Sequence, residues 1–237
     1  MSEDNRWLKS TANDLNNMLQ EISGYVHLAR KAAPASSDVG EHLESCMSSV
    51  ERASGTVHSI LAHLEGPQEQ PQKHYPAITL AAPKTDEKTA LGFKGLKSQT
   101  VEMINDVSVT NPAGTKETIM VVDDEVHVML LAKMMLAENG YRIITAKDGF
   151  EAIDNYKKAG KQIDLVILDF TMPGMHGDQV FEELRKINPS VAVILSSGFA
   201  DQGKLNRMFA QGLKEFVAKP YTQQRLLSEI RNVLDSV

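Results

Sequence analysis

Apolar residues recur at alternating intervals of four and three along the first 64 residues of the chain. The first series comprises Leu8, Ala12, Leu15, Leu19, Ile22, Val26 and Ala29. After a helix breaker at Pro34 and an N-cap candidate at Ser37 or Asp38, a second series comprises Val39, Leu43, Cys46, Val50, Ala53, Val57, Ile60 and Leu64. This spacing is typical of the seam between helices in a bundle or coiled coil. The pattern predicts a helical hairpin over residues 1–66.

Two helices alone leave much of such a seam in contact with water. A second copy of the hairpin would cover it by closing a four-helix bundle, the simplest symmetric solution. We therefore expect a homodimer formed through the N-terminal hairpin.

The stretch "STANDLNNML", residues 10–19, departs from ordinary helix composition. It places Asn13, Asp14, Asn16 and Asn17 within five positions of the first predicted helix. Asparagine and aspartate are weak helix formers, so a requirement other than helix propensity selected these residues.

Residues 67–116 lack the helical spacing of apolar residues, and we predict that they form a linker. They contain five prolines and are rich in Gln, Lys and Thr, a composition typical of connecting segments. The part "LKSQTVEMINDVSV" fits either a helical turn or a short strand, and the sequence does not choose between them.

From residue 117 to 237, short apolar runs alternate with amphipathic stretches. The runs are "TIMVV", "YRIIT", "IDLVIL", "VAVIL" and "KEFVA". Continuous apolar strands of this length are typical of a parallel sheet that is covered on both faces. The pattern predicts an α/β domain with a doubly wound, five-stranded parallel sheet.

Polar residues follow these strands where the strands end. Asp123 and Asp124 follow the first run, Asp169 ends the third, Ser196-Ser197-Gly198 closes the fourth and Lys219-Pro220 closes the fifth. The carboxyl ends of parallel strands face one crevice, so three carboxylates should meet there. Their mutual repulsion calls for a cation, and an all-oxygen site suits Mg²⁺. A carboxylate beside Mg²⁺ and a lysine can attack a phosphoryl group and form an acyl phosphate.

Composition narrows the partners and the compartment. A formal charge of −6 without Lys/Arg runs argues against nucleic-acid or anionic-membrane binding. No apolar run approaches the roughly 18 residues of a membrane span, and the N-terminus lacks a signal pattern. Cys46 is the only cysteine, which fits a reducing compartment. We expect a cytoplasmic protein.

Residues 117–237 resemble the receiver domain of two-component response regulators. The motifs "VVDDE", "LDFTMPGMHG", "ILSSGFA" and "FVAKPY" occur in the family's order and spacing. The resemblance implies that Asp169 is the phosphoacceptor and that Asp123 and Asp124 hold Mg²⁺ together with Asp169 and the backbone carbonyl of Thr171. It implies that Lys219 pairs with the phosphoryl group.

The same resemblance assigns two switch residues. Ser197 fits the switch hydroxyl better than Ser196, because a small residue follows it and it stands 22 positions before Lys219. Phe216 takes the position of the switch aromatic, without the hydroxyl of a tyrosine. In receivers these groups couple phosphorylation to a shift between two conformations.

The first predicted helix resembles the first dimerisation helix of hybrid sensor histidine kinases, of the HisKA type. The family box reads roughly A-H-D-F-N-N-L-L, and this chain has "ANDLNNML", with Asn13 at the position of the phosphoaccepting histidine. An amide cannot carry the phosphoryl group as imidazole does. The family's ATP-binding domain is also missing between hairpin and receiver. The resemblance therefore implies a pseudo-histidine kinase without autokinase activity.

Three functions compete. The first is a response regulator in two-component signal transduction: Asp169 accepts phosphate from a separate histidine kinase or phosphotransfer protein, and the hairpin is a scaffold that carries two receivers on a tether. Such a protein is not an enzyme beyond its own phosphorylation and dephosphorylation.

The second is a phosphorelay intermediate in which a bundle histidine exchanges phosphate with Asp169. The candidate histidines are His27, His42, His58 and His63. The third, a haloacid-dehalogenase-like phosphatase, expects a second aspartate where Thr171 stands.

Overall fold

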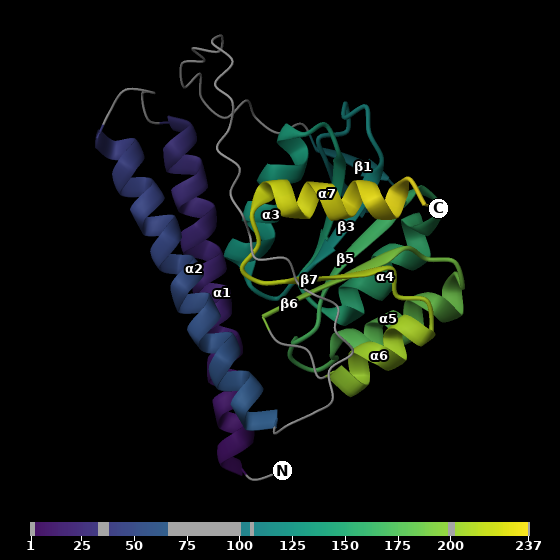
Figure 1. The fold of residues 1–237 in the computed structure, drawn as a ribbon. Coiled ribbons are helices and arrows are strands. Elements are labelled where there is room, and N and C mark those ends of the chain that lie inside the picture. The colour runs from purple at the N-terminus through teal and green to yellow at the C-terminus, as the bar shows by residue number, and fades with distance from the viewer. Residues whose placement is uncertain (1–2, 33–37, 66–100, 105–106, 199–201, 237) are drawn as a thin grey trace.

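The N-terminal part of the protein is a pair of long helices that lie side by side (Figure 1). The computed structural model describes residues 3–32, 38–65, 101–104, 107–198 and 202–236. Helix α1 spans Glu3–Ala32 and α2 spans Asp38–Glu65. Ala12 and Leu19 of α1 pack with Val50 and Val57 of α2 in a small core. The two predicted helices are confirmed, whereas the predicted breaker at Pro34 and the capping candidate Ser37 lie outside the described residues.

The hairpin buries only part of its predicted seam. The buried members are Ala12, Leu19, Val26, Val50 and Val57. Leu15, Ile22 and Ile60 remain 42%, 46% and 50% exposed, and Cys46 is exposed as well. Within one chain, therefore, α1 and α2 leave apolar surface uncovered.

The C-terminal part is built on one seven-stranded sheet. The strands are β1 (Val101–Ile104), β2 (Val107–Thr110), β3 (Thr118–Val122), β4 (Arg142–Ala146), β5 (Leu165–Asp169), β6 (Val193–Ser197) and β7 (Glu215–Ala218). Their order across the sheet is β1-β2-β4-β3-β5-β6-β7. The strands from β3 to β7 pair in parallel, which confirms the five predicted parallel strands.

The prediction of five strands in the sheet was too low, because β1 and β2 extend one edge. They pair antiparallel with each other, and β2 pairs antiparallel with β4. Val107 and Val109 are buried and add to the core on the side of α4. The undecided stretch "LKSQTVEMINDVSV" thus contains two strands, and the linker predicted over residues 67–116 extends too far at its C-terminal end. Residues 66–100 lie outside the described residues.

Helices cover both faces of the sheet (Figure 1). Helices α3 (Val126–Glu138) and α7 (Gln223–Leu234) pack on one face, and α4 (Gly149–Ala159), α5 (Gly177–Ile187) and α6 (Gln202–Ala210) on the other. A short 3₁₀ turn, η1 (Gly160–Gln162), follows α4. Along β3 the side chains alternate: Ile119 and Val121 join the core under α3 and α7, while Met120 and Val122 join the other core. The period of two thus divides these four residues between the two cores.

The hairpin is packed against the α/β domain through α1. Figure 1 shows α1 between α2 and the domain, beside α3. The sequence predicted that the hairpin carries the receivers on a tether, whereas the structure also shows direct contact between α1 and the domain. In the described part of the chain, no helix has the length and apolar character needed to cross a bilayer.

Candidate functional site

The site lies where the strand order of the sheet reverses. Strand β3 has β4 on one side and β5 on the other, and a crevice at such a switch point is the usual ligand site of a doubly wound sheet. Asp123 directly follows β3, and Asp169 is the last residue of β5. The topology therefore brings together two carboxylates that are 46 positions apart in the sequence.

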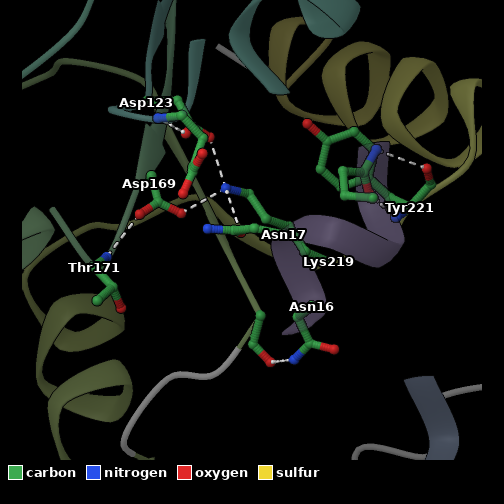
Figure 2. Close-up of polar contacts among 10 residues, drawn as sticks. Asn16, Asn17, Asp123, Asp169, Thr171, Lys219 and Tyr221 are labelled. Carbon is green, nitrogen blue, oxygen red and sulfur yellow. Dashed lines mark hydrogen bonds and ion pairs between the residues drawn. The ribbon is translucent and has the colours of Figure 1, made fainter. Parts of the chain in front are cut away.

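Lys219 joins these two carboxylates (Figure 2). Its Nζ lies 2.6 Å from Oδ2 of Asp123 and 2.8 Å from Oδ1 of Asp169. The lysine follows β7, its backbone N–H donates to the carbonyl of Ser197 at 2.8 Å, and a cis peptide bond joins it to Pro220. Its side chain is fully buried, so it acts as a fixed positive charge between two anions.

The remaining oxygens of both carboxylates accept backbone hydrogen bonds. Oδ2 of Asp169 accepts from the N–H of Thr171 at 2.8 Å, and Oδ1 of Asp123 accepts from the N–H of Glu125 at 3.0 Å. Lysine on one side and backbone on the other thus fix the orientation of each carboxylate.

Burial dominates the electrostatics of the pocket. It raises the pKa of Asp169 to about 6, with Lys219 acting to lower that pKa and Asp123 to raise it. Burial and then the charge of Asp123 raise the pKa of Asp124. Burial lowers the pKa of Lys219, but Asp169 and Asp123 outweigh it and raise this pKa above its ordinary value. One lysine faces three carboxyl groups, so the pocket carries excess negative charge.

The oxygen atoms of the pocket are the type of donor that a hard cation prefers, but their positions do not form a complete set of metal ligands. Within the described ranges, no group of three or more His, Cys, Asp or Glu side chains is arranged to hold a metal ion. Asp123 and Asp169 lie together through Lys219, with the backbone of Thr171 beside them. Oxygen donors with excess negative charge are what Mg²⁺ prefers, and burial together with the neighbouring charge of Asp123 raises the pKa of Asp124.

The predicted switch residues flank this pocket on the next two strands. Ser197 is the fully buried last residue of β6 and lies opposite Ala218 of β7. Phe216 in β7 is partly buried and packs against the core under α4, α5 and α6. The structure therefore brings Ser197 to the pocket edge and leaves Phe216 within β7, three residues before Lys219.

The sequence did not predict that α1 reaches this pocket. Asn13, Asn16, Asn17 and Gln20 are all buried, and Oδ1 of Asn17 lies 3.4 Å from Nζ of Lys219 (Figure 2). The unusual run of amides in the sequence could have indicated such a contact, but it did not identify the receiver as the partner. Asn13, at the position of the phosphoaccepting histidine in the resembled family, is 6% exposed.

The chain is similar to known proteins over its C-terminal half. Residues 119–231 match the family model of the response regulator receiver domain. The chemotaxis protein CheY of Bacillus subtilis is 30% identical over 118 residues, which are 49% of this chain and 97% of that protein. The sensor kinase CckA of Brucella abortus is 29% identical over 139 residues, which are 59% of this chain but only 14% of the kinase.

The chain is also similar to part of a solved structure. The CheX-CheY-BeF3-Mg²⁺ complex from Borrelia burgdorferi contains a chain that is 30% identical, covers 51% of this chain and 91% of its own length, and has a TM-score of 0.49. The family match spans β3 to α7 and includes Asp123, Asp169 and Lys219. Through this segment, the chain belongs to the family of response regulator receiver domains.

Proposed function

We propose that this protein is a response regulator whose Asp169 accepts a phosphoryl group from a separate histidine kinase or histidine phosphotransfer protein. The observation that carries the proposal is the bridge from Lys219 to both Asp123 and Asp169 at the switch point of the sheet. A receiver domain implies a phosphodonor of this kind.

The chemistry follows from the residues in the pocket. An ionised oxygen of Asp169 forms a bond to phosphorus while the bond between phosphorus and the donor's leaving group breaks, so the product is an acyl phosphate. Lys219 is positioned to neutralise charge on the transferred group. Mg²⁺, held by Asp123, Asp124, Asp169 and the carbonyl of Thr171, would supply charge neutralisation of the phosphoryl oxygens. Ser197 and Phe216 would then report the new group through β6 and β7.

The hairpin is the dimerisation scaffold in this proposal. On α1 the residues Leu15, Met18, Ile22 and Tyr25 are 42–59% exposed and follow the three-four spacing of one helix face. At 3.6 residues per turn, this stripe lies opposite the amides that face the receiver. A second copy of the hairpin could therefore cover the stripe while each α1 stays on its own receiver.

The hairpin has no kinase chemistry in this proposal. Asn13 lacks a nucleophilic nitrogen, and α1 presents no histidine beside Lys219: His27 lies ten residues beyond Asn17, about 15 Å along the helix axis. These features do not favour the relay alternative. The protein then acts as a regulator that catalyses only its own phosphorylation and dephosphorylation.

Labelling with acetyl phosphate and Mg²⁺, followed by mapping of acid-labile and acid-stable phosphate, tests the proposal. We expect phosphate on Asp169 that base or hydroxylamine releases, as for an acyl phosphate, and no label in Asp169→Asn, which keeps the shape and removes the nucleophile. Asp154→Asn is the matched control, because Asp154 is an exposed carboxylate on α4. Label that persists in Asp169→Asn, or phosphohistidine in the hairpin, would contradict the proposed function.

A further inference from the structure

Helix α1 is bound to the loops at the carboxyl ends of β6 and β7. The amide Nδ2 of Asn16 donates to the carbonyl of Gly198 at 2.8 Å. Gln20 binds the backbone of Tyr221 twice: its Oε1 accepts from the N–H at 2.6 Å, and its Nε2 donates to the carbonyl at 3.3 Å. Figure 2 shows Asn16 and Asn17 of α1 beside the pocket residues. These side chains occupy backbone groups that would otherwise be free to face solvent or a partner.

The contact extends to the chemical centre of the pocket. Nζ of Lys219 is shared among Asp123, Asp169 and, at a longer 3.4 Å, Oδ1 of Asn17. In this arrangement Asp169 is 1% exposed and Lys219 has no exposed surface. The helix therefore lies over the edge of the sheet from which a phosphodonor must approach Asp169.

The two surfaces are shaped to fit each other closely. A Cβ added at Gly198 would lie 2.5 Å from the Cβ of Asn16, and one at Gly24 would lie 2.5 Å from the side chain of Leu131 on α3. A larger residue at position 198 would clash with the Cβ of Asn16, and one at position 24 would require the side chain of Leu131 to move. One of the two glycines belongs to the receiver and the other to α1, so close approach depends on residues from both sides.

The polar character of the face suits reversible docking. Asn16, Asn17 and Gln20 hydrogen-bond to the receiver, and Asn13 is also buried. Each of these amides can hydrogen-bond water when the helix moves away, unlike a buried apolar face. This requirement accounts for the asparagines that helix propensity disfavours in α1. The apolar stripe of α1 lies on its opposite side and does not compete with this contact.

We propose that α1 is a displaceable cap on the phosphoacceptor pocket, so that the hairpin and the phosphodonor compete for the same face of the receiver. The proposal rests on the proposed function of Asp169. Docking of α1 slows phosphoryl transfer, and occupation of the pocket by a phosphoryl group weakens docking, because a coupling between two binding events acts in both directions. The second effect frees the amide face of α1 when the receiver becomes phosphorylated.

The test compares labelling rate and docking in the full-length protein. Gln20→Ala removes two hydrogen bonds to Tyr221, and Gly198→Ala forces the backbones of α1 and the receiver apart. Matched controls are Asp14→Ala, at an exposed position of α1, and Gly55→Ala in α2, where an added Cβ meets no atom within 4 Å. Labelling by acetyl phosphate with Mg²⁺ gives the rate, and amide hydrogen exchange of residues 13–24 gives the docking.

We expect both test variants to lose exchange protection in α1 and to label about tenfold faster, the effect of losing one or two ordinary hydrogen bonds, while both controls behave as the parent. Labelling of the parent should itself lower protection in α1. Unchanged labelling rates in variants that have lost protection would overturn the cap, as would protection that survives both substitutions. A failure of the proposed function looks different: no variant takes up label, even with α1 released.

Discussion

The receiver and the hairpin bury their side chains in different ways. In the receiver, each face of the sheet packs into a large apolar core, and the buried ion pairs of the described residues lie in the pocket. Among the described residues, the hairpin has a core of four buried side chains, while α1 buries a row of amides against the receiver and leaves apolar side chains exposed. The receiver therefore supplies its own stability, whereas the hairpin depends on surfaces outside itself.

The largest expected effect comes from truncating a core side chain, and its size should differ between the receiver and the hairpin. Phe181 of α5 is fully buried in the receiver core, and Phe181→Ala should lower the free energy of unfolding of the receiver by about 3–5 kcal/mol. Leu19→Ala, in the small core of the hairpin, should cost the hairpin about 2 kcal/mol, because fewer neighbours surround it. Chemical denaturation monitored by circular dichroism measures both. Equal losses in one cooperative transition would mean that the two regions unfold together.

A second substitution tests whether the exposed stripe of α1 is covered by another copy. Ile22→Asp should weaken the dimer by about 3 kcal/mol, since a buried isoleucine contributes about 1.5–3 kcal/mol and the change occurs twice in a two-fold interface. Light scattering over a dilution series measures this. Phe150→Asp is the control, because Phe150 is 64% exposed on α4 of the receiver. If only the control substitution dissociated the dimer, the interface would lie on the receiver and not on the hairpin.

The pocket should titrate near neutral pH. Without bound metal, burial raises the pKa of Asp169 to about 6, so its carboxyl becomes protonated as the pH falls through 6, and the protonated group is a poor nucleophile. In metal-free protein, Asp123→Asn should lower the pKa of Asp169 by removing repulsion, and Lys219→Met should raise it by removing the cation. Carbon-13 NMR of the carboxyl group measures the midpoints. Shifts of the same sign in both variants would contradict this account.

The smallest effect should come from the ion pair at the edge of the contact between α1 and the receiver. Nδ1 of His127 lies 3.4 Å from Oε1 of Glu21, and the histidine side chain is 60% exposed. An exposed pair of this kind contributes less than about 1 kcal/mol. Glu21→Gln should therefore change the exchange protection of α1 far less than Gln20→Ala does. A larger loss in Glu21→Gln, suppressed by salt, would mean that charge rather than amide hydrogen bonds holds the hairpin.

Much of the receiver could be predicted from the sequence because its signals are local. Each apolar run formed a strand, and Asp123, Asp169 and Lys219 met because strand ends converge at one edge of a parallel sheet. The edge strands β1 and β2 escaped prediction because four-residue strands beside turn residues resemble a helical turn equally well. The helical seam was predicted correctly as two helices, but the sequence could not say which half of it faces α2.

By itself, the sequence determined the elements, the pocket residues and the presence of an unexplained run of amides in α1. Only the tertiary structure decided what those amides bind, because Asn16 and Gln20 hydrogen-bond to backbone groups of Gly198 and Tyr221. Every residue has a backbone carbonyl, so the sequence does not show which carbonyl a side-chain amide will bind. The close approach at Gly198 and Gly24 could not be predicted from the sequence either, since a glycine needed for close approach looks the same as one needed for a turn.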